Sequence, residues 1–187
     1  MSRNFYIADT HFGHSNCLRF DARPFKTIEE HDMALITNWN AVVFQDDHVY
    51  VIGDFAYRNA RSVSFYTSKL HGHIHLIRGN HDNRSDQYES CFESVDDILK
   101  IRDELYGEPV EVIMCHYWIP FLRELRRGAY MLHGHTHRGS DEQLLEEQLK
   151  EEIRRTSKHR LHRAYNTGCM WQNYYPQTLE QIVARQQ

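Results

Sequence analysis

Seven side chains that can bind metal ions stand in short motifs along this chain. In chain order they are Asp9, His11, Asp54, Asn80, His116, His135 and His137. Two divalent ions held about 3.5 to 4 Å apart need nitrogen and oxygen ligands from both sides, and a group that can bridge them. Carboxylate, imidazole and amide groups meet that need, so these residues are suited to a dinuclear metal centre.

The spacing within two of these motifs also favours metal binding. In Asp9-Thr10-His11 an extended backbone places the first and third side chains on one face, so both can reach one ion. His135-Thr136-His137 repeats this arrangement. Glycines stand beside ligands at Gly53, Gly79 and Gly134, where the missing side chain lets the backbone come close to an ion or make an unusual turn.

Three predicted β-strands deliver the first of these motifs. Residues 4–8, 48–52 and 74–77 are rich in residue types that favour strands, and each run ends where a ligand motif begins. A capping box from Thr27 to Glu30 and apolar residues at helical spacing predict a helix over 28–39, and 59–70 is a predicted crossover helix. This order favours parallel βαβ units with functional loops at the carboxyl ends of the strands.

The second half of the chain has a different pattern. Residues 98–102 and 110–114 flank a Gly107-Glu108-Pro109 turn, which predicts an antiparallel hairpin that runs into His116. Residues 130–133 then lead into the paired histidines. Residues 140–158 are charged and carry only a narrow apolar stripe of Leu145, Leu149 and Ile153. They predict a surface helix docked on its own domain, with a lid or a self-association surface as the alternatives.

Composition narrows the class of protein. The chain has 187 residues, of which 41% are hydrophobic, and this fits one domain better than two. A formal net charge of −4 gives no strong nucleic-acid signal. No apolar run approaches the ~20 residues of a membrane span, so no membrane is expected. The four cysteines are widely separated, which predicts reduced thiols in a cytoplasmic protein.

Taken together, the motifs resemble those of a known family. Asp9-Thr10-His11, Gly53-Asp54, Gly79-Asn80-His81-Asp82, His116 and Gly134-His135-Thr136-His137 are similar, in this order, to the calcineurin-like metallophosphoesterases, in particular small bacterial and phage members. The resemblance implies an α/β fold, a four-layer α/β/β/α sandwich of two mixed sheets flanked by helices. It implies a single domain over 1–187, in which about 139–163 is a charged helical insertion.

The same resemblance implies a role for each ligand. Asp9, His11 and His137 would hold the first ion and Asn80, His116 and His135 the second, while Asp54 would bridge them. The cofactor would be two divalent ions, with manganese favoured and iron, zinc, nickel, cobalt or magnesium as alternatives suited to mixed nitrogen and oxygen ligands. A hydroxide that bridges the ions would attack the phosphorus atom of the substrate.

Several further residues are candidates for the reaction. By the resemblance, His81 would lie near the leaving-group oxygen as a proton donor or charge stabiliser, and Asp82 could orient it or else cap the following helix. Arg78, His14 and Arg58 are candidate substrate contacts. Arg78 could instead pair with a nearby acid, and His14 could simply be exposed on a loop.

The predicted function is hydrolysis of phosphate esters by a metal-dependent enzyme. We expect a phosphodiesterase that acts on small or nucleotide-like esters, since a chain of this length has few residues for further recognition elements. The alternatives are a phosphomonoesterase for phosphoproteins or metabolites, a nuclease, and a scaffold without activity. The intact set of ligand positions argues against the scaffold. A small phosphate ester is the expected partner, and a homo-oligomer is left open.

Overall fold

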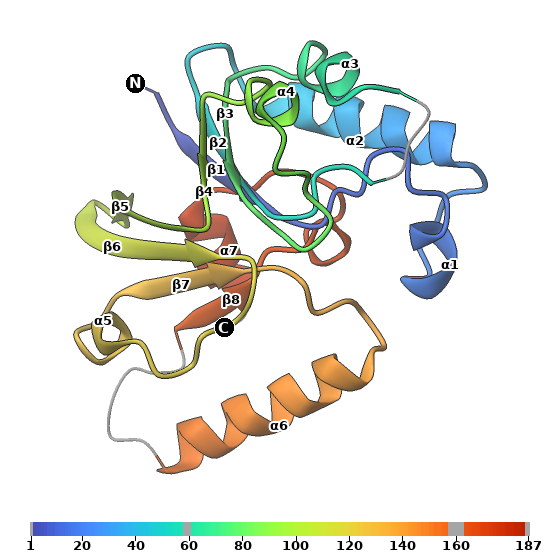
Figure 1. Cartoon of the computed structure of the whole chain (residues 1–187). Coiled ribbons are helices and arrows are strands. Elements are labelled where there is room, and N and C mark those ends of the chain that lie inside the picture. The colour runs from blue at the N-terminus through green and yellow to red at the C-terminus, as the bar shows by residue number, and fades with distance from the viewer. Residues whose placement is uncertain (1, 58–60, 157–162, 186–187) are drawn as a thin grey trace.

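The computed structural model describes residues 2–57, 61–156 and 163–185, which form two four-stranded sheets (Figure 1). The first sheet comprises, in spatial order, β1 (Asn4–Ile7), β2 (His48–Ile52), β3 (His73–Ile77) and β4 (Ser94–Asp96). Its described strand pairs are all parallel. The second sheet comprises β5 (Ile98–Leu105), β6 (Glu108–Cys115), β7 (Tyr130–His133) and β8 (Ala164–Asn166).

The strand pairing confirms the main sequence-based predictions and corrects one. The predicted hairpin is β5 and β6, which pair antiparallel from Ile98 opposite Cys115 to Leu105 opposite Glu108. The remaining pairs of the second sheet, β6 with β7 and β7 with β8, are parallel. The first sheet is parallel in its described pairs instead of mixed, whereas the second sheet is mixed as the resemblance implied. Parallel neighbours need long crossover connections, and the segments between these strands provide them.

Helices flank the two sheets. They are α1 (Cys17–Phe20), α2 (Ile28–Val42), α3 (Val63–Thr67), α4 (Asp86–Glu89), α5 (Arg123–Arg126), α6 (Asp141–Thr156) and α7 (Leu179–Arg185), with a 3₁₀ turn at Cys169–Trp171. The predicted cap forms at α2, where the Glu30 amide donates to Thr27 Oγ1 at 3.2 Å. The reciprocal bond of a capping box differs from the prediction, since the Glu30 carboxylate accepts from the amide of Lys26 at 2.9 Å. The crossover helix predicted over 59–70 is shorter in the structure. It is α3, which begins after its cap Ser62 and ends at Thr67. None of the described helices is long and apolar enough to cross a bilayer.

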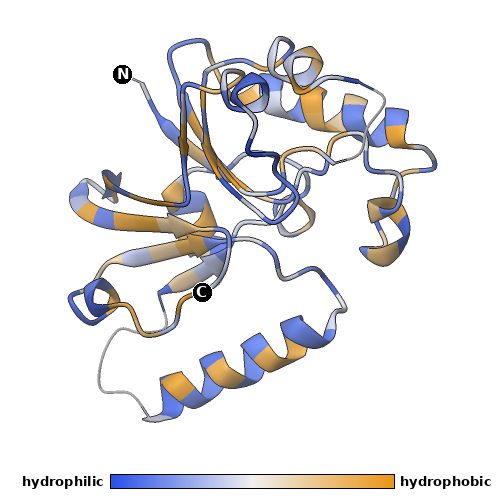
Figure 2. Ribbon diagram, viewed as in Figure 1, coloured by the Kyte–Doolittle hydropathy of each residue, from blue (hydrophilic) through white to orange (hydrophobic). Residues whose placement is uncertain are grey.

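Alternation along the strands creates two apolar layers around the first sheet. Phe5 and Ile7 face outward and pack with Leu35 and Trp39 of α2. Tyr6 and its neighbours on the opposite face pack against the second sheet. A third cluster on the outer face of the second sheet includes Leu125 of α5 and Ile153 of α6. The result is the predicted sandwich of two sheets with helices outside (Figures 1 and 2).

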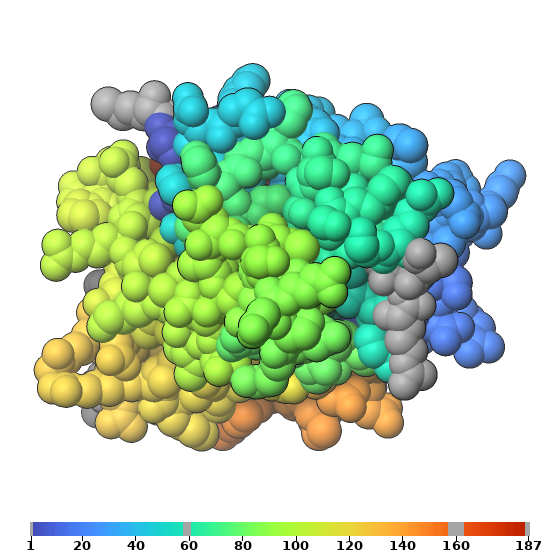
Figure 3. Space-filling model, turned by 45° about the horizontal axis from the view of Figure 1, so that its top comes forward, coloured from blue at the N-terminus to red at the C-terminus, as the bar shows by residue number. Residues whose placement is uncertain are grey.

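The two halves of the chain are closely joined. The inner face of the first sheet packs against the second sheet, and in the space-filling view the lime-green and yellow segments adjoin on one face of the molecule (Figure 3). The start and the far end of the chain also meet, because Ala8 donates its amide to Thr167 and accepts from the amide of Cys169, both at 2.8 Å. Residues just before the first ligand motif are thus held by residues that follow β8.

Candidate metal centre

The ligand candidates converge because each follows the carboxyl end of a strand. Asp9 comes after β1, Asp54 after β2 and Asn80 after β3, so these three meet at one edge of the first sheet. His116 follows β6, and the paired histidines follow the neighbouring strand β7. Because the two sheets pack face to face, the loops that follow β1, β2 and β3 meet the loops that follow β6 and β7 at one edge of the sandwich.

The side chains form two adjoining groups of possible ligands. One contains Asp9, His11 and His137 and the other contains Asp9, Asp54 and His116, with the ligand atoms of each group within 4.8 Å of one another. Asp54 lies between them, since its Oδ2 is 3.7 Å from His11 Nε2 and 3.6 Å from His116 Nε2. A carboxylate in this position can bridge two cations.

The other expected ligands lie at the edges of these groups. His116 Nε2 is 3.1 Å from the amide oxygen of Asn80. The ring of His135 lies 5.2 Å from that of His116, measured between centroids. His11 and His137 approach to 3.4 Å between their Nε2 atoms. The structure therefore brings all seven predicted ligands together.

The backbone at the ligands has an uncommon conformation. Asp9, His11, Asp54 and His135 all have positive φ values, of 54°, 49°, 56° and 67°. For residues other than glycine, this left-handed conformation costs roughly 1–2 kcal/mol each. Strain concentrated in this way is typical of functional sites, where the fold holds a side chain in a required direction.

All three predicted glycines are required for steric reasons, and at Gly53 a Cβ atom would lie 2.1 Å from His116 Nδ1. A Cβ atom at Gly79 would collide with the carboxylate of Asp54, and one at Gly134 would lie 2.7 Å from Asp9 Oδ2. The loops after β3 and β7 therefore touch the carboxylates of the other loops directly. This packing is the close backbone approach that the sequence predicted.

Burial sets the protonation of the ligands. Asp9 and His11 have no exposed surface. Burial raises the pKa of Asp9 to about 6, although the nearby imidazoles of His116 and His137 partly oppose the shift. Burial also lowers the pKa of His11 well below its usual value, so this imidazole is already neutral and ready to bind a cation.

The affinity for a divalent cation should consequently depend on pH. Below about pH 6 a cation must displace a proton from Asp9, so Mn²⁺ affinity should fall by up to about tenfold per pH unit as the pH decreases. Above that pH the dependence should weaken but persist until His137 has lost its proton, because, although burial opposes the shift, contact with Asp21 raises the pKa of this ligand. Calorimetric titration with Mn²⁺ between about pH 5 and 7 tests this. An affinity that does not change with pH over this interval would contradict it.

Two buried residues that sequence reasoning missed support the site from behind. Arg23 donates from Nη2 to the carbonyl of Asp9 at 2.8 Å and from Nη1 to that of Thr10 at 3.1 Å. Its Nε donates to Asp21 Oδ2 at 2.9 Å. The same oxygen of Asp21 lies 3.5 Å from Nδ1 of His137, an electrostatic contact longer than a strong hydrogen bond. This contact favours a proton on Nδ1 and leaves Nε2 for a metal.

Asp21→Asn should weaken metal binding about 10- to 100-fold, the range usual for carboxylates that orient a ligating histidine. The substitution removes the charge beside His137 and half of the acceptor capacity for Arg23. Equilibrium dialysis with Mn²⁺ measures the effect. Asp46→Asn, at an exposed aspartate, is the matched control and should bind as the parent protein does. Equal affinities for the two variants would contradict a positioning role for Asp21.

His81 lies on the open side of the site. Its side chain is 30% exposed and its Nε2 is 3.9 Å from Asp54 Oδ2. Its backbone amide donates to Asp54 Oδ1 at 2.9 Å, and its ring lies 4.1 Å from that of Tyr57. The imidazole is thus next to the ligands and accessible to a substrate.

The structure gives Asp82 partners other than the expected ones. Its carboxylate accepts from the amides of Asp54, Phe55 and Gly79 at 2.8–3.0 Å, and from the Tyr88 hydroxyl at 2.6 Å. These four bonds occupy both oxygens, so Asp82 holds the loops after β2 and β3 together instead of orienting His81. The cap of the following helix α4 is Ser85.

The three candidate substrate contacts differ in position. His14 lies at the rim of the site, with its Nδ1 3.4 Å from His11 Nδ1 and its ring 4.9 Å from that of Tyr57. Arg78 pairs with Glu89 at 2.6 Å and with Asp97 at 3.3 Å, which is the alternative that the sequence left open. Arg58 lies outside the residues that the structure describes.

Similar proteins agree with this architecture. A protein of unknown function from Aquifex aeolicus has a similar fold, with a TM-score of 0.69 and 22% identity over 98% of this chain and 99% of that one. The gene 66 protein of Mycobacterium phage L5 is 30% identical over 165 residues, which cover 73% of this chain and 78% of the phage protein. An uncharacterized protein from Methanocaldococcus jannaschii is 39% identical over 90 residues, 47% of this chain and about half of that protein.

A family model confirms the resemblance carried by the motifs. The model of the calcineurin-like phosphoesterase superfamily domain matches residues 4–168. This range includes both sheets and the seven ligand candidates. The chain therefore belongs to the calcineurin-like phosphoesterase superfamily.

Proposed function

We propose that this protein is a dinuclear metal-dependent phosphodiesterase for small or nucleotide-like esters. The observation that carries the dinuclear centre is the position of Asp54, whose carboxylate lies within 4 Å of a histidine from each ligand group. A carboxylate so placed can bind a cation on each of its two sides. Family membership supports hydrolysis of phosphate esters.

The donor set fits two divalent ions. Asp9, His11 and His137 would hold one ion, and Asn80, His116 and His135 would hold the other, with Asp54 between them. When bound, such ions activate water and neutralise charge that develops on the phosphate. Manganese is the proposed ion, while the mixed nitrogen and oxygen donors also suit iron, zinc, nickel, cobalt or magnesium.

His81 completes the proposed chemistry. Water adds to phosphorus, the bond from phosphorus to one ester oxygen breaks, and that oxygen takes up a proton. A proton on the His81 imidazole, which lies on the open side of the ligands, can be donated to the departing oxygen. The neighbouring ring of Tyr57 restricts the imidazole to this side of the site.

The positive side chains near the centre favour a diester over a monoester. Arg138, directly after the ligand His137, donates from Nη2 to the carbonyl of Met170 at 2.7 Å. Two other arginines near the ligand motifs are already paired with acids, Arg23 with Asp21 and Arg78 with Glu89 and Asp97. A phosphomonoester carries two negative charges near neutral pH and a diester carries one. A site in which these cations are committed to acidic partners is better matched to the diester.

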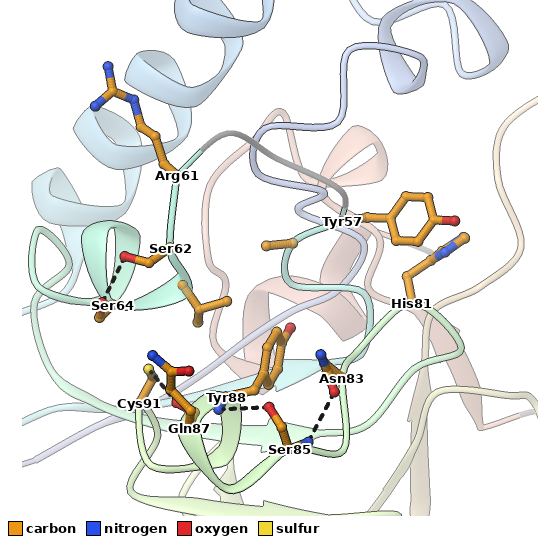
Figure 4. Close-up of a pocket in the computed structure, with 12 residues that line it drawn as sticks. Tyr57, Arg61, Ser62, Ser64, His81, Asn83, Ser85, Gln87, Tyr88 and Cys91 are labelled. Atoms are coloured by element: carbon orange, nitrogen blue, oxygen red, sulfur yellow. Dashed lines mark hydrogen bonds between the residues drawn. The ribbon is translucent and has the colours of Figure 1, made fainter.

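A cavity beside His81 can hold one ester substituent. It has a volume of about 570 Å³ and is bounded by Tyr57 and His81 on the side of the metal centre. In Figure 4 the side chains of Asn83, Gln87 and Tyr88 extend into one region, while the guanidinium of Arg61 points away from it. The lining contains amides, hydroxyls and aromatic rings but, among the described residues, no carboxylate. These groups suit an uncharged, planar substituent such as a nucleoside.

The cellular location can also be inferred. All four cysteines are free, and Cys17, Cys115 and Cys169 are buried. Free thiols are usual in a reducing compartment, which supports a cytoplasmic enzyme.

Comparative hydrolysis of bis-p-nitrophenyl phosphate and p-nitrophenyl phosphate tests the proposal. Chelator-treated protein should regain activity when Mn²⁺ is added, with a higher kcat/KM for the diester. Separate additions of Ni²⁺, Co²⁺, Zn²⁺ and Mg²⁺ identify the most effective ion. A higher kcat/KM for the monoester would establish a phosphatase instead, and no turnover with any of the ions would contradict the assignment.

A further inference from the structure

Helix α6 is held against the protein by charged side chains. Of its apolar stripe only Ile153 is buried, while Leu144, Leu145 and Leu149 are 55%, 65% and 40% exposed. Glu146 and Lys150 face inward instead, with side chains only 10% and 13% exposed. Apolar burial therefore contributes little to the position of this helix, and the contacts of these two residues decide it.

Glu146 touches both sides of the loop that carries His135 and His137. Its Oε2 accepts from the hydroxyl of Thr136, the residue between these two ligands, at 2.6 Å. Its Oε1 lies 3.2 Å from Nε2 of His133, which ends β7 directly before the loop. One carboxylate from α6 thus fixes the loop at its start and at its middle.

Lys150 compensates the buried charge of Glu146. The ammonium lies 2.5 Å from Glu146 Oε1 and 5.2 Å from the ring centroid of Trp118. Burial alone would raise the pKa of Glu146, but contact with His133 and Lys150 lowers it to about 2. The carboxylate is therefore ionised at neutral pH and remains a strong acceptor for the Thr136 hydroxyl.

The loop needs such support because of its backbone. His135 has a positive φ of 67°, and its amide donates to Asp9 Oδ2 at 3.1 Å. On the other side, Asn166 donates from Nδ2 to the carbonyl of Thr136 at 2.9 Å. The Thr136 hydroxyl and carbonyl are thus held by different elements, and only the hydroxyl is held by α6.

We propose that Glu146 is a positioning residue for the metal centre, and that docking of α6 and binding of metal stabilise each other. The inference rests on the proposed metal site but not on any particular substrate. The docked helix is inferred to hold His135 and His137 in their binding geometry and so to favour metal binding. Thermodynamic linkage then requires that bound metal stabilise the docked position of the helix by the same free energy. Residues of the charged insertion then contribute to the centre.

The test compares Glu146→Gln with Glu147→Gln, which makes the same change of charge one residue away at an exposed position. Mn²⁺ affinity should fall about 10- to 100-fold in the first variant and stay unchanged in the second. Thr136→Val removes only the hydroxyl and should reproduce part of the loss without disturbing Lys150. The visible spectrum of Co²⁺-loaded protein should change in Glu146→Gln, because it reports the ligand geometry.

Amide hydrogen exchange over 141–156 provides the reciprocal measurement. Mn²⁺ should slow exchange in this helix in the parent protein and in Glu147→Gln, but much less in Glu146→Gln. Equal metal affinities for the two glutamate variants, together with exchange that does not respond to metal, would overturn the inference. If the parent protein binds Mn²⁺ and shows these effects but hydrolyses no diester, only the proposed substrate class fails.

Discussion

Asp54→Asn should reduce metal-dependent hydrolysis of bis-p-nitrophenyl phosphate to background and lower the bound metal from two ions to about one. The carboxylate of Asp54 lies within 4 Å of both His11 and His116. An amide has the same shape but no charge, and it offers one oxygen instead of two. The remaining amide oxygen can still accept from the His81 backbone amide, as Asp54 Oδ1 does at 2.9 Å, so the expected loss concerns the bridge. Activity assays and elemental analysis of the dialysed protein measure it.

The fold of this variant should be intact. The backbone amide of Asp54 still donates to Asp82, and this bond does not depend on the substituted side chain. Circular dichroism should therefore match that of the parent protein, and Asp46→Asn should retain both ions and full activity. A folded Asp54→Asn protein with two ions and normal turnover would show that another residue forms the bridge.

His81→Ala should keep both metal ions but slow the reaction by about 10²- to 10⁴-fold, the usual range for loss of a proton donor. The imidazole lies beside the ligands, but its Nε2 is 3.9 Å from Asp54, outside the two groups of ligand atoms. The defect should be small for a diester that releases p-nitrophenolate, which leaves without a proton, and larger for one that releases an alkoxide. Single-turnover rates with the two kinds of ester measure this difference.

His73→Ala is a suitable control, since His73 is exposed at the start of β3, at the opposite end of the strand from the ligands. It should leave both rates unchanged. Loss of metal from His81→Ala would mean that this imidazole is a ligand. An equal defect for both kinds of ester would assign it a role other than proton donation.

The sequence predicted the features that depend on residues close together in the chain. The helix cap at Thr27, the hairpin of β5 and β6, and the strands before Asp9 and Asp54 each produce a local pattern of polarity or turn residues. Their positions agree with the structure to within a few residues. Because the first three strands were predicted to be parallel, the convergence of the ligand motifs that follow them could be predicted from the geometry of the sheet.

Features that depend on distant contacts were missed or misjudged. Asp21 and Arg23 show no motif, because their partners in the ligand loops are set by the folded chain. Asp82 follows His81 in sequence, yet its carboxylate accepts from the amide of Asp54 in the loop after β2 and from that of Gly79 in its own loop. The parallel pairing of β6, β7 and β8 was equally hidden, since α5 and α6 could have led to strands of either direction. Each of these outcomes depends on which segments meet in space.

The hydrogen bonds between Ala8 and residues 167 and 169 have a consequence for biosynthesis. The first ligand motif emerges from the ribosome early, but the residues that fix the preceding strand are made after nearly the whole domain. Contacts between such distant positions give the domain a topology that closes slowly. A nascent chain that stops before residue 167 can contain every proposed ligand and still lack the last support of its first motif. We therefore expect tight metal capture to begin only after the chain has passed this point.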